Sequence, residues 1–218
     1  MRDALYAAEA GADFLGYIFY PPSKRFIAPR NAAEIARAVR EKVPHVQHVG
    51  VFVDDQAANV AWLVNLVGLD YVQLHGRESA DYCAELETLG VRTIKTVGIG
   101  EVGASVDPAA YGTVDYFLCD THDDNLKGGT GRRFDLGSLP DGIPPERLFL
   151  AGGLNPDNIA ELLAEIKPFA VDVSTGVEIS PGLKSHKRIK DFIENLQAAI
   201  APAEDYEQNE EASAPNVS

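Results

Sequence analysis

The sequence predicts an α/β protein and, within that class, a (β/α)8 TIM barrel whose first β-strand is missing from the chain. Three observations support this fold: helical and strand-like segments alternate, seven strand-like runs occur, and a helical segment precedes all of them. Such alternation implies a parallel sheet with right-handed crossovers. A flavodoxin-like open sheet is the alternative fold.

The predicted strands are short runs rich in β-branched and aromatic residues. They span residues 13–20, 45–53, 69–76, 91–99, 114–120, 147–153 and 170–176. Their nearly continuous apolar content is typical of parallel strands that are covered on both faces.

The predicted helices carry apolar residues at i, i+3, i+4 and i+7, a spacing that forms one buried stripe on each helix. The stripes are Val60, Leu63, Val64 and Val67, then Ile159, Leu162, Leu163 and Ile166, and finally Ile189, Phe192, Ile193 and Leu196. Before the second stripe, Asn155 is a predicted N-cap and Pro156 suits the first helical position.

The two ends of the chain differ from the body in pattern and composition. Residues 2–10 have a helical pattern with no strand before them. Because a barrel pairs each helix with a preceding strand, we expect a first strand just upstream of Arg2, encoded by the in-frame codons before Met1. We therefore assign residues 1–201 to a barrel lacking strand 1. Residues 202–218 are acidic and poor in large apolar residues, which predicts a disordered tail.

The composition argues against several classes of partner. The 218 residues include 19 Lys and Arg against 33 Asp and Glu, a net charge of −14, so we expect neither nucleic acid nor an anionic membrane as a partner. The two cysteines, Cys83 and Cys119, have no metal-ligand spacing, nor do the histidines, so no metal site is expected. Free cysteines and the lack of a signal-peptide pattern or membrane-length apolar segment predict a cytoplasmic protein.

Two glycine-containing loops predict a phosphate site. Gly152 and Gly153 end one predicted strand, and Ser174, Thr175 and Gly176 end the last. Glycine lets backbone N–H groups approach an anion, and a following helix N-terminus adds a favourable dipole. Loops after the seventh and eighth barrel strands commonly hold a substrate phosphate. A tight strand-to-helix turn is the alternative explanation for the first loop.

Three further side chains stand at predicted strand ends. Asp120 is a candidate general acid or base, although a lone aspartate more often fixes a loop. Its neighbour Cys119 should point the opposite way, toward the helices, because strand side chains alternate. Arg25 could hold a carboxylate bidentately, and His75 could orient a ligand; a solvated arginine and a structural histidine are the alternatives.

Taken together, these stretches resemble the phosphoribosylanthranilate isomerase family of tryptophan biosynthesis. The matching pieces, in order, are AAEAGADFLGYIFYPPSKRFI, GVFVDD, DYVQLHGRES, FLCDT, GGTGRRFDL, LAGGLNPDN and VDVSTGVE, which span nearly the whole chain up to the last helix. The resemblance implies an Amadori rearrangement of N-(5′-phosphoribosyl)anthranilate to 1-(2-carboxyphenylamino)-1-deoxyribulose 5-phosphate. It implies a small phosphorylated substrate, no cofactor and no metal, in a monomer or a homodimer.

The resemblance also implies roles for individual residues. Asp120 matches the general acid, Arg25 the arginine near the anthranilate carboxylate, and His75 a histidine near the substrate. The remaining matches are Gly152, Gly153, Ser174, Thr175 and Gly176 in the phosphate cradle, with Gly129 and Thr130 in a flexible substrate-covering loop. The family's general base is a cysteine in a Lys-x-Cys-Gly motif on the first strand, which the residues of this chain do not contain.

Neither cysteine of the chain is expected to replace that base, because Cys83 falls in a helix and Cys119 should face the helices. A non-catalytic or truncated phosphate-binding barrel is therefore an alternative function, which predicts phosphate-ligand binding without turnover. Another phosphate-binding barrel enzyme, such as indole-glycerol-phosphate synthase, is a third. The short chain, the GGTGRRFDL loop and the lack of a lysine well placed for catalysis at the strand ends argue against it.

Overall fold

A computed structural model of the chain describes residues 1–98, 107–120 and 139–201. The predicted tail at 202–218 and the predicted substrate-covering loop with Gly129 and Thr130 lie outside the described residues.

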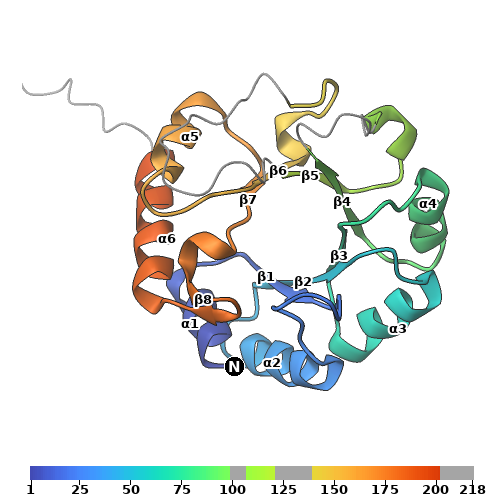
Figure 1. The fold of residues 1–218 in the computed structure, drawn as a ribbon, viewed down its shortest axis with the longest axis horizontal. Coiled ribbons are helices and arrows are strands. Elements are labelled where there is room, and N and C mark those ends of the chain that lie inside the picture. The colour runs from blue at the N-terminus through green and yellow to red at the C-terminus, as the bar shows by residue number, and fades with distance from the viewer. Residues whose placement is uncertain (99–106, 121–138, 202–218) are drawn as a thin grey trace, which may run out of the picture.

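The centre of the structure is a seven-stranded parallel sheet that follows the chain order β1 to β7. Its strands are β1 (Phe14–Ile18), β2 (Gln47–Phe52), β3 (Tyr71–Leu74), β4 (Thr93–Gly98), β5 (Tyr116–Asp120), β6 (Leu148–Ala151) and β7 (Ala170–Val171). The sheet curls into an incomplete barrel (Figure 1), so all seven predicted strands and the barrel class are confirmed. Within the described residues β1 and β7 do not pair with each other. The predicted additional strand stays a prediction.

Helices surround the convex side of this sheet (Figure 1). The α-helices are α1 (Arg2–Ala10), α2 (Pro29–Lys42), α3 (Ala57–Val67), α4 (Ala80–Thr88), α5 (Ile159–Glu165) and α6 (His186–Ile200). Short 3-10 helices are η1 (Pro108–Tyr111), η3 (Pro145–Arg147) and η4 (Thr175–Val177), and β8 (Glu178–Ser180) with β9 (Leu183–Lys184) forms a small antiparallel hairpin that the sequence did not predict.

The predicted start of the helix after β6 is wrong. The helix α5 begins at Ile159 with Asn158 as its N-cap, and not at Asn155 and Pro156. The Asn155 side chain instead accepts the backbone N–H of Asp157 at 2.8 Å, and the Asn155 N–H donates to the Asn158 side chain at 2.9 Å. These bonds close a turn, because short polar side chains compete with the helix for backbone groups.

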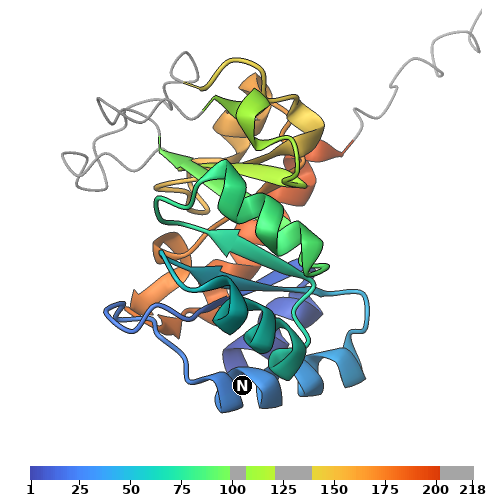
Figure 2. The same ribbon diagram turned by 90° about the vertical axis from the view of Figure 1, so that its right-hand side faces the viewer.

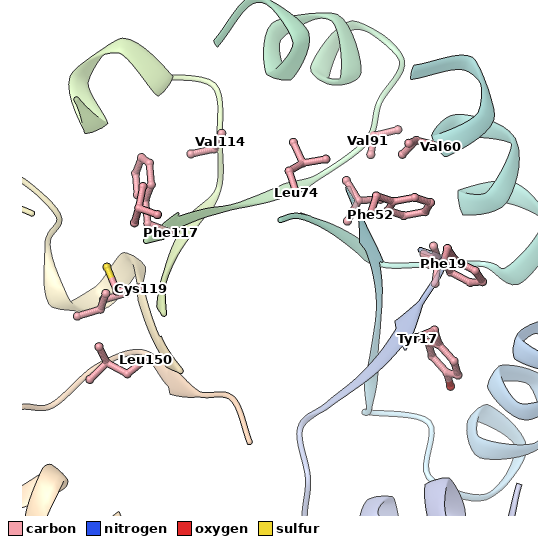
Figure 3. Close-up of a cluster of buried hydrophobic side chains, with 14 of the residues drawn as sticks. Tyr17, Phe19, Phe52, Val60, Leu74, Val91, Val114, Phe117, Cys119 and Leu150 are labelled. Atoms are coloured by element: carbon pink, nitrogen blue, oxygen red, sulfur yellow. The ribbon is translucent and has the colours of Figure 1, made fainter. Parts of the chain in front are cut away.

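Outward-facing strand residues pack against the helices in the main core. This layer includes Leu74, Phe117, Cys119 and Leu150, with Phe52 from β2 (Figure 3). The predicted outward direction of Cys119 is confirmed, because its side chain is fully buried in this layer.

Inward-facing residues fill the amino-terminal half of the barrel interior. Phe14, Tyr71, Tyr116 and Phe149 pack mostly edge to face, with ring centroids 5.3–6.3 Å apart in four of these pairs. Because this end is packed with aromatic rings, polar groups collect at the carboxyl ends of the strands. The loop after β1 and the β8–β9 hairpin lie together at that end (Figure 2).

A buried ion pair holds two of the loops at this end. Lys95 on β4 is 2% exposed, and its Nζ donates to Glu78 Oε2 at 2.7 Å and to the Gly76 carbonyl at 2.8 Å. Glu78 in turn accepts the backbone N–H groups of Asp54 and Gly76. The pair therefore ties the loop after β2 to the loop after β3.

The substitution Lys95→Met should lower the free energy of unfolding by about 3–5 kcal/mol, because it leaves the buried Glu78 carboxylate without its cation. Urea denaturation measures this. The matched control is Lys187→Met, which removes an exposed i,i+4 pair with Asp191 and should change the free energy of unfolding far less. Equal costs for the two variants would contradict the structural role of the buried pair.

Candidate active site

Two carboxyl groups face the barrel interior at the same level of the sheet. Asp120 at the end of β5 pairs in register with Ala151 of β6, and the Asp172 N–H donates to the carbonyl of Leu150 at 2.8 Å. Neighbours in register share a face, and Ala151 belongs to the inner cluster. Asp120 and Asp172 therefore flank the small Ala151 side chain at the carboxyl end of the barrel.

His75 reaches the same region from the end of β3. Its Nδ1 lies 3.1 Å from Gln73 Nε2 and 3.1 Å from Thr96 Oγ1. An amide N–H is only a donor, so Nδ1 accepts and the ring proton is assigned to Nε2. Nε2 lies 3.8 Å from Asp120 Oδ2, which is beyond a direct hydrogen bond but within electrostatic reach. The side chains of His75 and Asp120 are 38% and 24% exposed, so a ligand can reach both.

The environment of Asp172 favours its protonated form. Loss of hydration raises the pKa of this carboxyl above its ordinary 3.8, and the charge of Asp120 raises it further, against smaller opposing effects of His75 and Lys184. A carboxyl that keeps its proton beside a second carboxyl can donate a hydrogen bond to a ligand hydroxyl.

The two glycine loops pack directly on each other. Gly152 and Gly153 have φ values of 94° and 65°, which glycine adopts without strain. A Cβ atom on Gly176 would stand 1.8 Å from the carbonyl oxygen of Leu154, so only glycine lets these two backbones approach this closely. The fold therefore brings together the two segments in which the sequence predicted a phosphate site.

Arg25 lies in the loop after β1 and bonds to Glu178, the first residue of β8. Its Nε donates to Glu178 Oε1 at 2.9 Å, and its Nη2 donates to Glu178 Oε2 at 2.7 Å. Lys184 on β9 donates to the same carboxylate at 3.2 Å and to the Ser174 carbonyl at 3.0 Å. A cationic cluster thus adjoins the loop of residues 174–176.

The cysteines have no place in this site. Burial raises the pKa of the Cys119 thiol to about 12 and that of Cys83, on α4, to about 11. Thiols buried in the core with such pKa values are not nucleophiles or bases near pH 7. Among the residues that the structure describes, no group of three or more His, Cys, Asp or Glu side chains could hold a metal ion. No helix in the described ranges is long and apolar enough to span a membrane.

Sequence reasoning missed four polar residues around these groups: Gln73, Thr96, Asp172 and Glu178. Strand alternation could have found Gln73 and Asp172, since they lie two residues before His75 and Ser174. Glu178 had no such signal, because its partner Arg25 lies 153 residues away in the sequence.

The pKa shift of Asp172 predicts a pH-dependent gain in stability for Asp172→Asn. A carboxyl whose folded pKa is raised costs no stability below its unfolded value, and the cost grows as pH rises toward the folded value. In urea denaturation the variant should therefore gain more over the parent at pH 7.5 than at pH 3. The matched control is Asp141→Asn, the same substitution at an exposed aspartate, measured at the same two pH values. A gain equal at both pH values would contradict the assignment.

Comparison with known proteins connects this geometry to one family. The profile of the family described as N-(5′-phosphoribosyl)anthranilate (PRA) isomerase matches residues 1–195. A relative of that name from Geobacter sp. (strain M21) is 42% identical over 193 residues, which cover 88% of this chain and 91% of the relative. One from Thermotoga petrophila is 40% identical over 198 residues, which cover 90% and 94%.

Solved structures agree with the sequence relatives. Phosphoribosyl anthranilate isomerase from Thermotoga maritima superposes with a TM-score of 0.79 at 38% identity, covering 90% of this chain and 94% of that chain. A second structure, of the isomerase in complex with reduced 1-(o-carboxyphenylamino)-1-deoxyribulose 5-phosphate, gives 0.76 at 37% identity, covering 90% and 93%. The chain belongs to the N-(5′-phosphoribosyl)anthranilate isomerase family.

Proposed function

We propose that this chain isomerises N-(5′-phosphoribosyl)anthranilate to 1-(2-carboxyphenylamino)-1-deoxyribulose 5-phosphate in tryptophan biosynthesis. One observation supports this most strongly. The two packed glycine loops, the Arg25 cluster and the interior carboxyl Asp120 all follow the carboxyl ends of the strands. The proposed substrate carries a phosphate, an aromatic carboxylate and a ribose ring, and each of these matches one of the three features.

The chemistry assigned to this site is an Amadori rearrangement. Asp120 gives a proton to the ribose ring oxygen while the bond between that oxygen and C1 breaks, which leaves a protonated Schiff base. A general base then removes the C2 proton, and the electron pair moves to give an enolamine. Protonation of the enolamine at C1, with loss of the C2 hydroxyl proton, gives the ketose. The first-strand cysteine expected as the base stays a prediction.

Binding residues follow from the same geometry. The loops with Gly152 and Gly153 and with residues 174–176 hold the phosphate, since backbone N–H groups suit a compact anion. Arg25 pairs with the anthranilate carboxylate. His75, whose Nε2 lies 3.8 Å from Asp120 Oδ2, donates to a ribose oxygen between them.

Asp120→Asn should lower turnover by about 10²–10⁴-fold, because an amide cannot give up the proton that opens the ring. Conversion of N-(5′-phosphoribosyl)anthranilate, followed by chromatography, measures it. Asp115→Asn is the matched control, since Asp115 stands at the opposite end of β5 and bonds to Arg92; it should keep parental turnover. Unchanged turnover in Asp120→Asn would remove Asp120 from the mechanism. Ligand binding without turnover in the parent would favour the non-catalytic barrel.

Gly176→Ala should weaken binding of the reduced product analogue by tenfold or more. The added Cβ would collide with the Leu154 carbonyl and separate the two loops that hold the phosphate. Isothermal titration calorimetry measures the affinity. Gly112→Ala is the control, because Gly112 directly follows η1 and nothing lies within 4 Å of a Cβ added there. Equal affinity in both variants would place the phosphate elsewhere.

A further inference from the structure

The Glu178 carboxylate, beside the proposed substrate site, accepts hydrogen bonds from several groups. It is 5% exposed and accepts from Arg25, from Lys184 and from the backbone N–H of Gly182. Burial opposes its ionisation, but the hydrogen bonds from Arg25, Gly182 and Lys184 outweigh burial and lower the pKa of Glu178 to about 2. The carboxylate is therefore charged at neutral pH and holds two cations.

The Glu178 carboxylate occupies one particular edge of the Arg25 guanidinium. Nε donates to both carboxylate oxygens, at 2.9 and 3.1 Å, and Nη2 donates to Oε2 at 2.7 Å. A guanidinium has a second edge, formed by Nη1 and the other proton of Nη2, which can bind another carboxylate bidentately. In the described part of the chain Arg25 Nη1 donates to no residue. Arg25 is thus held by one edge with the other edge available.

The same carboxylate is also linked, through Lys184, to the loop of residues 174–176. Lys184 Nζ lies 3.2 Å from Glu178 Oε1 and 3.0 Å from the Ser174 carbonyl oxygen. Gly182 N–H bonds to the same Oε1 at 3.1 Å, which fixes the hairpin turn from which Lys184 extends. Glu178 therefore connects the proposed carboxylate-binding arginine, to which it bonds directly, with the proposed phosphate loop, to which it is linked through Lys184.

The charges in this cluster favour an anionic ligand. Two side-chain cations against the Glu178 carboxylate leave one net positive charge among these three side chains, although the Asp3 carboxylate also accepts the Lys184 backbone N–H and the whole chain carries −14. Local charge of this kind acts over a few ångströms, while the distant acidic surface is screened by salt.

We propose that Glu178 is a positioning residue that fixes the orientation of Arg25 and its distance from the phosphate loop. The chain thereby selects ligands that carry a carboxylate and a phosphate at a set separation. This inference rests on the proposed function, because it assumes that Arg25 and the loop of residues 174–176 bind the two ends of one substrate. A rigid arginine loses less conformational freedom on binding and so discriminates more strongly.

The test is the effect of Glu178→Gln on the affinities for two ligands. One ligand is the reduced product analogue, and the other is the same compound without its aromatic carboxylate; calorimetry gives both dissociation constants. The parent should bind the carboxylated ligand at least tenfold more tightly. Glu178→Gln should reduce this ratio about tenfold and change the affinity for the ligand without the carboxylate less than threefold.

Two further variants separate positioning from a general structural effect. Lys184→Met removes the link to Ser174 but keeps the pair of Arg25 and Glu178. It should therefore weaken the binding of both ligands by the same factor and leave the ratio of their dissociation constants unchanged. If circular dichroism shows that Glu178→Gln does not fold, this variant still tests the link. Glu194→Gln removes an exposed pair with Lys190 and should change neither affinity.

The outcomes separate the two proposals. If Glu178→Gln leaves the ratio of the two dissociation constants unchanged, the positioning role is overturned and the proposed function stays intact. If Lys184→Met changes the ratio of the two dissociation constants, then the link from Glu178 to Arg25 and the link from Lys184 to Ser174 do not act separately, which overturns that part of the proposal. A parent chain that binds neither ligand, or does not distinguish them, contradicts the proposed function itself and with it the inference.

Discussion

The parallel register of the sheet is the constraint on which the rest of the structure depends. Every strand from β1 to β7 hydrogen-bonds to the next in chain order, so all seven carboxyl ends lie on one rim. Alternation along β5 then sends Cys119 into the helix layer and Asp120 into the interior. A shift of one residue in that strand would exchange these two side chains, burying a carboxyl among apolar groups. The register therefore serves both the core and the site.

Local pattern was sufficient for the strands and for some side-chain directions. Continuous apolar runs located all seven strands, and parity alone placed Cys119 correctly. Contacts between residues far apart in the sequence could not be predicted from local pattern. The start of α5 moved to Ile159 because asparagine side chains captured the backbone of the preceding turn. The pairing of Arg25 with Glu178 depends on bringing the loop after β1 next to β8, and no sequence spacing encodes that contact.

The site combines two kinds of electrostatic environment a few residues apart. Between Asp120 and Asp172 the raised pKa of Asp172 limits the negative charge, which suits proton donation to a neutral sugar oxygen. Around Glu178 the opposite holds, because two cations keep that carboxylate ionised. The two carboxyls thus differ in charge although both follow β7 in the chain, and Lys184 acts electrostatically on each of them.

The most direct measurement is a crystal structure of this chain with reduced 1-(o-carboxyphenylamino)-1-deoxyribulose 5-phosphate bound. We predict that the phosphate lies between the loop of Gly152 and Gly153 and the loop of residues 174–176. The aromatic carboxylate should lie on the Nη1–Nη2 edge of Arg25, with Glu178 still bonded to the Nε–Nη2 edge. A phosphate bound away from both loops, or an Arg25 that leaves Glu178 when the ligand binds, would contradict these predictions.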